Sequence, residues 1–321
     1  MAEQHHKLII LGSGPAGCTA AIYAARAGLT PAIICGMQPG GQLTITTDVE
    51  NYPGYAEPVQ GPWMMEQMQK QAEHCGTTFI YDHINAVELK KPPFTLKGDG
   101  ATYTCDALII CTGASAKWLG IPSEKALQGK GVSACATCDG PFFRNAEVVV
   151  VGGGNSAMEE ALFLANICSK VTMIHRRDSF RGELVLRERV AKNEKITILW
   201  DSEIDEILAD AAKGGVVRAV RVKNLNTGNT SEIPAEGVFI AIGHKPNTDI
   251  FKGILPMDDY GYLVVPKGSV TTKIEGVFAA GDVIDATYRQ AVTAAGLGCM
   301  AALDAVRYFE GQEASEPSSA A

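Results

Sequence analysis

The chain has 321 residues, of which 46% are hydrophobic and 20% are charged, a composition typical of a globular protein. Its formal net charge is -8 at pH 7 and it has no dense basic stripe, so we expect no nucleic-acid partner. No apolar run approaches the roughly 18 residues that cross a bilayer, so we expect no membrane span. The nine scattered cysteines argue against a secreted disulfide-stabilised protein and indicate a reducing, cytoplasmic environment.

The N-terminal part reads as the start of a dinucleotide-binding domain. An apolar strand over 7–11 leads into the loop GSGPAG and an alanine-rich helix over 18–27, the order that the dinucleotide fingerprint requires. The glycines let a pyrophosphate approach the backbone, and the start of the helix offers free N–H groups. A tight structural turn is the alternative. The loop residues that we predict to bind a nucleotide are Gly12, Ser13, Gly14, Pro15, Ala16 and Gly17.

The rest of this first domain contains a loop, a helix and several strands. A strand over 31–35 ends without the acidic residue that would bind a ribose hydroxyl. The Gly-, Pro- and Thr-rich loop that follows is long enough to be functional or disordered. A Met-rich helix is expected over 63–76, alternating strands over 79–89 and 94–103, and a buried strand over 107–111.

Cys135 and Cys138 are spaced as CxxC in the hexapeptide CATCDG. Thiols at this spacing can close to a disulfide, and such motifs lower the pKa of one thiol, which predicts a redox pair. Half of a zinc site is the alternative. No second CxxC or Cys/His pair occurs at a zinc-binding spacing, so we predict no metal site.

A second strand, glycine loop and helix follow over 147–151, GGGNSA and 157–166. The next strand, over 170–174, ends in HRRDSFR. An acid at this position would bind the 2′-hydroxyl of NAD, whereas arginines bind a 2′-phosphate, so NADPH is predicted over NADH. A solvated basic run is the alternative. The residues predicted to bind NADPH are Gly152, Gly154, Asn155, Ser156, Ala157, His175, Arg176, Arg177 and Arg181.

The apolar strands ending near Gly113 and Gly243 predict two crossings between domains. We expect an α/β protein of two three-layer, Rossmann-like dinucleotide-binding domains, the second inserted in the first. The predicted boundaries are 1–115 and 245–321 for the domain with the first glycine loop and 116–244 for the NADPH domain, which carries the CxxC. A helix is expected over 290–309, with a disordered tail over 312–321.

These motifs together resemble the low-molecular-weight thioredoxin reductases over nearly the whole chain. The segments that carry the resemblance are GSGPAG, PGGQL, CATCD, GGGNSA, HRRDSFR and GVFAAGDV. The resemblance implies FAD and NADPH as cofactors, a homodimer, and an NADPH domain that alternates between two orientations. Pro141 departs from the pattern, because a larger apolar or aromatic residue is expected after the hexapeptide.

The resemblance also assigns FAD to three segments: the first glycine loop, the PGGQL loop and the C-terminal Gly-Asp segment. Asp282 would accept from a sugar or ribityl hydroxyl, with a turn-capping acid as the alternative, and the start of the last helix would stabilise charge on a reduced flavin. Beyond the first loop, the predicted FAD residues are Gly36, Gly41, Gln42, Leu43, Asn51, Gly113, Gly281, Asp282, Arg289, Gln290 and Ala291.

The implied function is NADPH-dependent reduction of the thioredoxin disulfide through FAD and the Cys135–Cys138 pair. By resemblance Cys138 faces the flavin, Cys135 attacks the partner's disulfide, and Asp139 is the acid–base group. For Asp139, a cap at the start of a helix is the alternative.

Three other functions remain open at this point. A flavoprotein reductase of another thioredoxin-like or peroxiredoxin-system partner would share the motifs. The reductases of peroxiredoxin-system partners, however, carry an extra N-terminal redox domain, for which we expect no room before Gly12. A dithiol oxidase would not need NADPH, so the arginines after residue 174, which are predicted to bind NADPH, argue against this function. A catalytically idle nucleotide-binding regulator would not need the intact CxxC.

Overall fold

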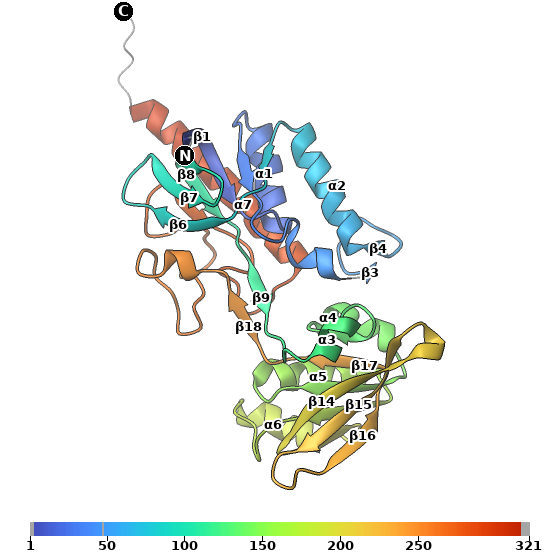
Figure 1. The fold of residues 1–321 in the computed structure, drawn as a ribbon. Coiled ribbons are helices and arrows are strands. Elements are labelled where there is room, and N and C mark those ends of the chain that lie inside the picture. Colours follow the sequence, from blue (N-terminus) through green and yellow to red (C-terminus); the bar gives the residue numbers. More distant parts are fainter. Residues whose placement is uncertain (1–2, 47, 316–321) are drawn as a thin grey trace, which may run out of the picture. The chain divides into compact units, whose positions relative to one another are not determined.

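The computed structural model describes residues 3–46 and 48–315, which form two compact units (Figure 1). The discontinuous unit comprises residues 1–115 and 245–321, and the inserted unit comprises residues 116–244. The chain crosses between them along β9 (Ala114–Ala116) and β18 (His244–Pro246), which are hydrogen-bonded to each other as a two-stranded sheet. Among the described residues, no helix is both long and apolar enough to span a membrane.

The discontinuous unit is built on a seven-stranded sheet. Its strands, in spatial order, are β5 (Thr78–Ile80), β2 (Ala32–Ile34), β1 (Glu3–Leu11), β8 (Thr102–Ile110), β7 (Phe94–Gly98) and β6 (Ile84–Glu88), with β19 (Val277–Ala279) also paired to β8. The strands β5, β2, β1, β8 and β19 pair parallel with one another, whereas β7 pairs antiparallel with both β8 and β6. The inner strands β1 and β8 are apolar and buried in their C-terminal halves, over 8–11 and 107–110, where both faces of the sheet are covered.

Helices α1 (Pro15–Arg26) and α7 (Ala291–Ser315) lie side by side in this unit (Figure 1). Small residues permit the close approach: a Cβ added to Gly298 would lie 2.1 Å from the carbonyl oxygen of Ala16. The remaining elements of the unit are η1 (Gly41–Ile45), β3 (Asp48–Val49), β4 (Val59–Gln60), α2 (Gly61–His74) and η4 (Asp249–Phe251).

The inserted unit has three layers. A parallel sheet in the order β10 (Val132–Ser133), β17 (Gly237–Ile240), β11 (Glu147–Val151), β12 (Lys170–Ile174) and β13 (Ile196–Leu199) forms the middle. One face packs on helices and the other on an antiparallel meander, each through its own apolar core. These outer elements are α3 (Pro122–Leu127), α4 (Ala136–Asp139), η2 (Gly140–Phe143), α5 (Asn155–Ile167), α6 (Leu184–Ala191), β14 (Ser202–Asp210), η3 (Ala211–Lys213), β15 (Val216–Asn224) and β16 (Thr230–Pro234).

The predicted α/β class is confirmed, and β12 has the predicted bounds. The single strand expected over 79–89 is wrong, because the chain turns at Asp82, whose carboxylate accepts backbone N–H groups from His83, Gly100 and Ala101. The separate strands expected over 94–103 and 107–111 are also wrong: β8 is one strand that pairs with β7 at its start and β19 at its end. Helix α7 continues through Ser315, so the disordered tail expected over 312–321 is wrong for residues 312–315, and residues 316–321 lie outside the described residues.

Candidate functional site

Cys135 and Cys138 form a disulfide at the start of α4, with their Cα atoms 5.3 Å apart. The Cys138 N–H donates to Cys135 Sγ at 3.3 Å, and the Asp139 N–H donates to the Cys135 carbonyl at 3.1 Å. The first of these bonds aims a hydrogen-bond donor at the sulfur, which would stabilise negative charge on Cys135 after reduction. Both cysteines are half-buried, so the pair is partly open to solvent. The geometry suits a disulfide that is opened and closed repeatedly.

Asp139 is the last residue of α4, beside the disulfide. Burial raises the pKa of its carboxyl, and a hydrogen bond from Ser133 acts in the opposite direction. Its Oδ1 is buried and has no hydrogen-bond partner among the described residues. Asp139 precedes η2 without forming a side-chain cap, which leaves the alternative of a helix-start cap without support. A carboxyl that keeps its proton next to a disulfide can donate that proton to a departing thiolate.

The first glycine loop has the shape that a dinucleotide needs. A Cβ on Gly12 would lie 2.2 Å from the Cys111 carbonyl oxygen, and one on Gly17 would lie 1.9 Å from the Gly12 carbonyl oxygen. These two glycines therefore serve close packing. The Gly14 position has no atom within 4 Å of an added Cβ, and no side chain caps the start of α1. Open space before uncapped N–H groups fits a pyrophosphate.

Other predicted FAD residues gather around this loop. The Gly40 N–H donates to Ser13 Oγ at 2.9 Å, and a Cβ on Gly41 would lie 3.3 Å from the Gly14 Cα. The backbone at Gly281 has a φ of 81° and lies so close to Ala16 that an added Cβ would be 2.9 Å from the Ala16 Cβ. The PGGQL and Gly-Asp segments, distant in sequence, therefore both border the first loop.

The remaining predicted FAD residues lie in the same unit. Gln42 and Leu43 belong to η1. The Asn51 amide donates to Gln290 Oε1 at 3.3 Å, directly before α7 begins at Ala291. Gly36 and Gly113 have φ values of 74° and 68°, so both are turns that favour glycine. The Arg289 N–H donates to Asp285 Oδ2 at 3.1 Å.

Asp282 has an environment that penalises its ionisation. Burial, followed by the charge of Asp285, raises the pKa of the Asp282 carboxyl to about 6, while Arg289 lowers it. A protonated or partly protonated carboxyl can both donate and accept hydrogen bonds, which suits a sugar or ribityl hydroxyl.

This environment predicts a pH dependence of stability in the flavin-free protein. From about pH 4 to about pH 6 the unfolded chain releases the Asp282 proton while the folded protein keeps it. Stability should therefore fall as pH rises through this window, by up to ~3 kcal/mol. Urea unfolding of the wild type and of Asp282→Asn between about pH 4 and pH 6 measures this effect. The contributions of all other titrating groups cancel in the difference between the two free energies of unfolding. A wild type that gains stability relative to Asp282→Asn as pH rises would contradict the prediction.

The second glycine loop repeats the design of the first. A Cβ on Gly152 would lie 2.4 Å from the Ala241 carbonyl oxygen and 2.7 Å from the Ala157 Cβ. The Gly154 position again has nothing within 4 Å, and α5 begins there without a side-chain cap. The space and free N–H groups fit a second dinucleotide. Ser156 follows in the first turn of α5.

The arginine segment after β12 is tied to this loop. The Arg181 N–H donates to the Gly153 carbonyl at 3.0 Å, and Arg176 and Arg181 both act on the pKa of His175. Arg176 and Arg181 are exposed and Arg177 is half-buried. None of the three guanidinium groups forms an ion pair with a carboxylate of residues 3–46 and 48–315. The arginines are thus available to an anion beside the loop.

His175 and Asn155 have mainly supporting contacts. The His175 ring lies under Gly153 and packs against Phe180 and Trp200, and burial lowers the pKa of the ring. The Asn155 amide donates to Glu183 Oε1 at 3.2 Å and accepts the Glu183 N–H at 2.8 Å. Both residues hold the loop and the arginine segment together.

Sequence reasoning missed two contributors to this arrangement. Glu183 binds Asn155 across 28 positions, and Arg187 Nε donates to the Gly182 carbonyl at 2.6 Å. The one local signal is Gly182, where an added Cβ would lie 2.2 Å from Met158. A glycine inside a charged segment indicates a close backbone approach.

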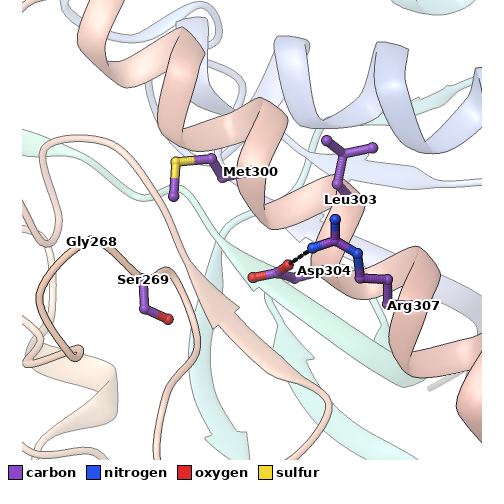
Figure 2. A pocket seen from close by; sticks show the side chains of 6 residues that line it. All are labelled: Gly268, Ser269, Met300, Leu303, Asp304 and Arg307. Carbon is purple, nitrogen blue, oxygen red and sulfur yellow. Dashed lines mark hydrogen bonds and ion pairs between the residues drawn. The ribbon is translucent and has the colours of Figure 1, made fainter.

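A hollow beside α7 contains none of the predicted site residues. It is lined by Gly268, Ser269, Met300, Leu303, Asp304 and Arg307 (Figure 2). Within the described part of the chain, no group of three or more His, Cys, Asp or Glu side chains is placed to hold a metal ion.

The comparisons with known proteins agree on one family. The model of the pyridine nucleotide-disulphide oxidoreductases matches residues 6–298. A thioredoxin reductase of Rickettsia conorii is 59% identical over 304 residues, which cover 94% of this chain and 98% of that protein. A Pseudomonas fluorescens protein named glucosaminate ammonia-lyase is 58% identical over 322 residues, covering 98% of this chain and 99% of its own.

A solved structure extends the agreement to three dimensions. Thioredoxin reductase from Giardia duodenalis superposes with a TM-score of 0.90 at 44% identity, covering 96% of this chain and 99% of that one. The likeness thus includes both units, both glycine loops and the segment with the disulfide. The chain belongs to the pyridine nucleotide-disulphide oxidoreductase family and, within it, to the low-molecular-weight thioredoxin reductases.

Proposed function

We propose that this protein reduces the disulfide of thioredoxin with electrons from NADPH. The observation that carries the proposal is the Cys135–Cys138 disulfide beside a buried carboxyl, in a chain with two dinucleotide loops. The cofactors of the family are FAD and NADPH. When bound, FAD supplies a carrier that accepts two electrons from the nicotinamide and releases them to a disulfide.

Each loop would hold one cofactor. The first loop, with Ser13 and Gly14 beside the Gly40–Gly41 turn, would bind the FAD pyrophosphate, and Asp282 would bind a hydroxyl of the same molecule. The second loop would bind the NADPH pyrophosphate, and the exposed arginines would bind the 2′-phosphate. The assignment of each residue to its cofactor is part of the proposal.

The reduced pair would act on the partner by thiol–disulfide exchange. The Cys135 thiolate attacks one sulfur of the thioredoxin disulfide, whose S–S bond breaks as a Cys135–thioredoxin bond forms. The Cys138 thiolate then attacks Cys135 Sγ, which releases the second thioredoxin thiolate and re-forms the Cys135–Cys138 disulfide. Asp139 gives a proton to the departing thiolate. In sum, NADPH, a proton and the partner disulfide yield NADP and the partner dithiol.

An NADPH oxidation assay with three separate additions tests this function. We expect rapid oxidation with thioredoxin and slow oxidation with glutaredoxin. The third addition is D-glucosaminate, assayed for ammonia, because one relative carries the name of an ammonia-lyase. Ammonia release without a response to thioredoxin would overturn the proposal. A faster response to glutaredoxin would move it to another thioredoxin-like partner.

We propose further that the protein is a cytoplasmic homodimer. Seven cysteines are free thiols, which suits a reducing compartment. Exposed apolar side chains on α1 and α7, namely Tyr23 (44%), Met300 (37%) and Leu303 (41%), support burial against a second copy. Light scattering of the purified protein decides between monomer and dimer.

The arginine segment predicts a preference between nicotinamide cofactors. Replacing Arg176 and Arg181 by Ala removes charge-assisted bonds to the 2′-phosphate, so the KM for NADPH should rise about tenfold to a hundredfold. NADH lacks this phosphate, so its KM should stay within about twofold. Steady-state kinetics with both cofactors measure the effect, and Arg189→Ala, an exposed arginine on α6, is the matched control. Equal effects on both cofactors would contradict a 2′-phosphate site.

A further inference from the structure

The end of the arginine segment is fastened to the second glycine loop at three consecutive residues. The Arg181 N–H donates to the Gly153 carbonyl at 3.0 Å. Gly182 lies so close to Asn155 that an added Cβ would be 2.4 Å from Asn155 Oδ1. The Glu183 N–H donates to the same oxygen at 2.8 Å, and Asn155 Nδ2 donates to Glu183 Oε1 at 3.2 Å. Both ends of the Asn155 amide are thus bonded to one residue, Glu183.

The Glu183 side chain does not serve its own helix. Glu183 directly precedes α6, where a negative charge can interact with the free N–H groups of the first turn. Its carboxylate makes no capping bond there and reaches instead to the start of α5, 28 positions away in the sequence. It also forms no ion pair within residues 3–46 and 48–315. The carboxylate is therefore committed to Asn155.

The rest of the arginine segment and the loop itself are held independently of Glu183. The Asp201 N–H donates to the Arg177 carbonyl at 3.2 Å, which ties the first arginines to the residue before β14. The Gly152 N–H donates to the carbonyl at the end of β12 at 3.1 Å. Removal of the Glu183 carboxylate should therefore loosen the backbone around Arg181 and leave the loop in place.

We propose that Glu183 is a positioning residue for the 2′-phosphate of NADPH, because through Asn155 it fixes Arg181 against the second loop. The inference rests on the proposed function, in which this arginine binds that phosphate. An arginine on a fixed backbone loses less conformational entropy when it binds. Glu183 thereby favours a phosphate ligand, although its own negative charge, close to Arg181 in the chain, repels that ligand.

These two effects of the carboxylate have opposite signs, so its removal shows which one dominates. If the charge dominates, Glu183→Ala binds NADP more tightly, because a like charge near the phosphate is lost. If positioning dominates, the same variant binds NADP more weakly. NAD lacks the 2′-phosphate, so in that case its affinity should barely change.

The test is calorimetric titration of the oxidised holoenzyme with NADP and with NAD, which measures binding without turnover. In Glu183→Ala the Kd for NADP should rise about threefold to tenfold, and the Kd for NAD should stay within about twofold. Glu183→Gln keeps an acceptor for the Asn155 amide and should bind NADP at least as tightly as the wild type. Glu188→Ala is the matched control, because it removes another exposed carboxylate beside α5, paired only with Lys192, and should bind as the wild type does.

Combination with the arginines locates the effect. On an Arg181→Ala background, Glu183→Ala should leave the Kd for NADP unchanged, because the side chain that it positions is gone. On an Arg176→Ala background it should keep its full effect, because the start of the segment is held elsewhere. Thermal unfolding of each variant shows that the fold is intact.

Unchanged or tighter NADP binding in Glu183→Ala overturns the proposal, as does an equal loss of NAD binding. It is also overturned if Glu183→Gln binds as weakly as Glu183→Ala, or if the effects of Glu183→Ala and Arg181→Ala add. The proposed function fails separately: a wild type that binds NADP no more tightly than NAD has no 2′-phosphate site. If the wild type prefers NADP and Arg181→Ala removes that preference while Glu183→Ala keeps it, only the role of Glu183 fails.

Discussion

Replacing Cys138 by Ser is expected to lower NADPH-dependent thioredoxin reduction at least about a thousandfold, because a serine hydroxyl neither stores electrons nor resolves a mixed disulfide. The remaining thiol, Cys135, can still attack the partner, so the variant should accumulate a covalent enzyme–thioredoxin complex. Cys135→Ser should lose activity to the same extent without forming the complex. The measurement is NADPH oxidation together with non-reducing electrophoresis after incubation with thioredoxin.

The matched control for this experiment is Cys168→Ser in the same unit. Cys168 is a free, buried thiol whose Sγ donates to the Phe143 carbonyl at 3.2 Å, a bond that serine can also make. Its activity should stay within about twofold of the wild type. If Cys138→Ser kept full activity, the Cys135–Cys138 pair could not be the route of electrons. If Cys135→Ser formed the covalent complex instead, the roles of the two thiols would be exchanged.

Much of the fold was predictable because its signals are local. A strand, a glycine loop and a helix occupy adjacent positions in the chain, so GSGPAG and GGGNSA predict their own geometry at Gly12 and Gly152. The apolar run of β12 was found with its bounds for the same reason. The turn at Asp82 was missed because it depends on N–H groups donated from residues 100 and 101, which no local pattern reveals.

The candidate site shows the same contrast between local signals and contacts of distant segments. The CxxC motif and the arginines after β12 indicate their chemistry through residues that are close together in the sequence. The hydrogen bonds between Asn155 and Glu183 join two segments far apart in the chain, so no local pattern shows them, and the NADPH contact predicted for Asn155 stays a prediction.

The two glycine loops allow the cofactors to be removed one at a time. Gly14 and Gly154 have φ values of -70° and -95°, which alanine adopts without strain, and an added Cβ at either position meets no atom within 4 Å. The fold should therefore accept both substitutions. A bound pyrophosphate, however, would have to share this space with the new methyl group.

Gly14→Ala should thus weaken FAD binding by about a hundredfold, which corresponds to ~2.7 kcal/mol, while NADPH binding is unaffected. Gly154→Ala should keep its flavin and raise the KM for NADPH about tenfold or more. Flavin absorbance of the purified proteins measures the FAD content, NADPH titration measures NADPH binding, and thermal unfolding measures the stability of the fold.

Gly296→Ala is the neutral control, because it lies on α7 with nothing within 4 Å of an added Cβ. Gly17→Ala is the contrasting control, since its Cβ would lie 1.9 Å from the Gly12 carbonyl oxygen and should destabilise the fold itself. The assignment of FAD to the first loop and NADPH to the second requires that Gly14→Ala and Gly154→Ala each lose a different cofactor. Loss of flavin from Gly154→Ala, with Gly14→Ala unaffected, would reverse that assignment.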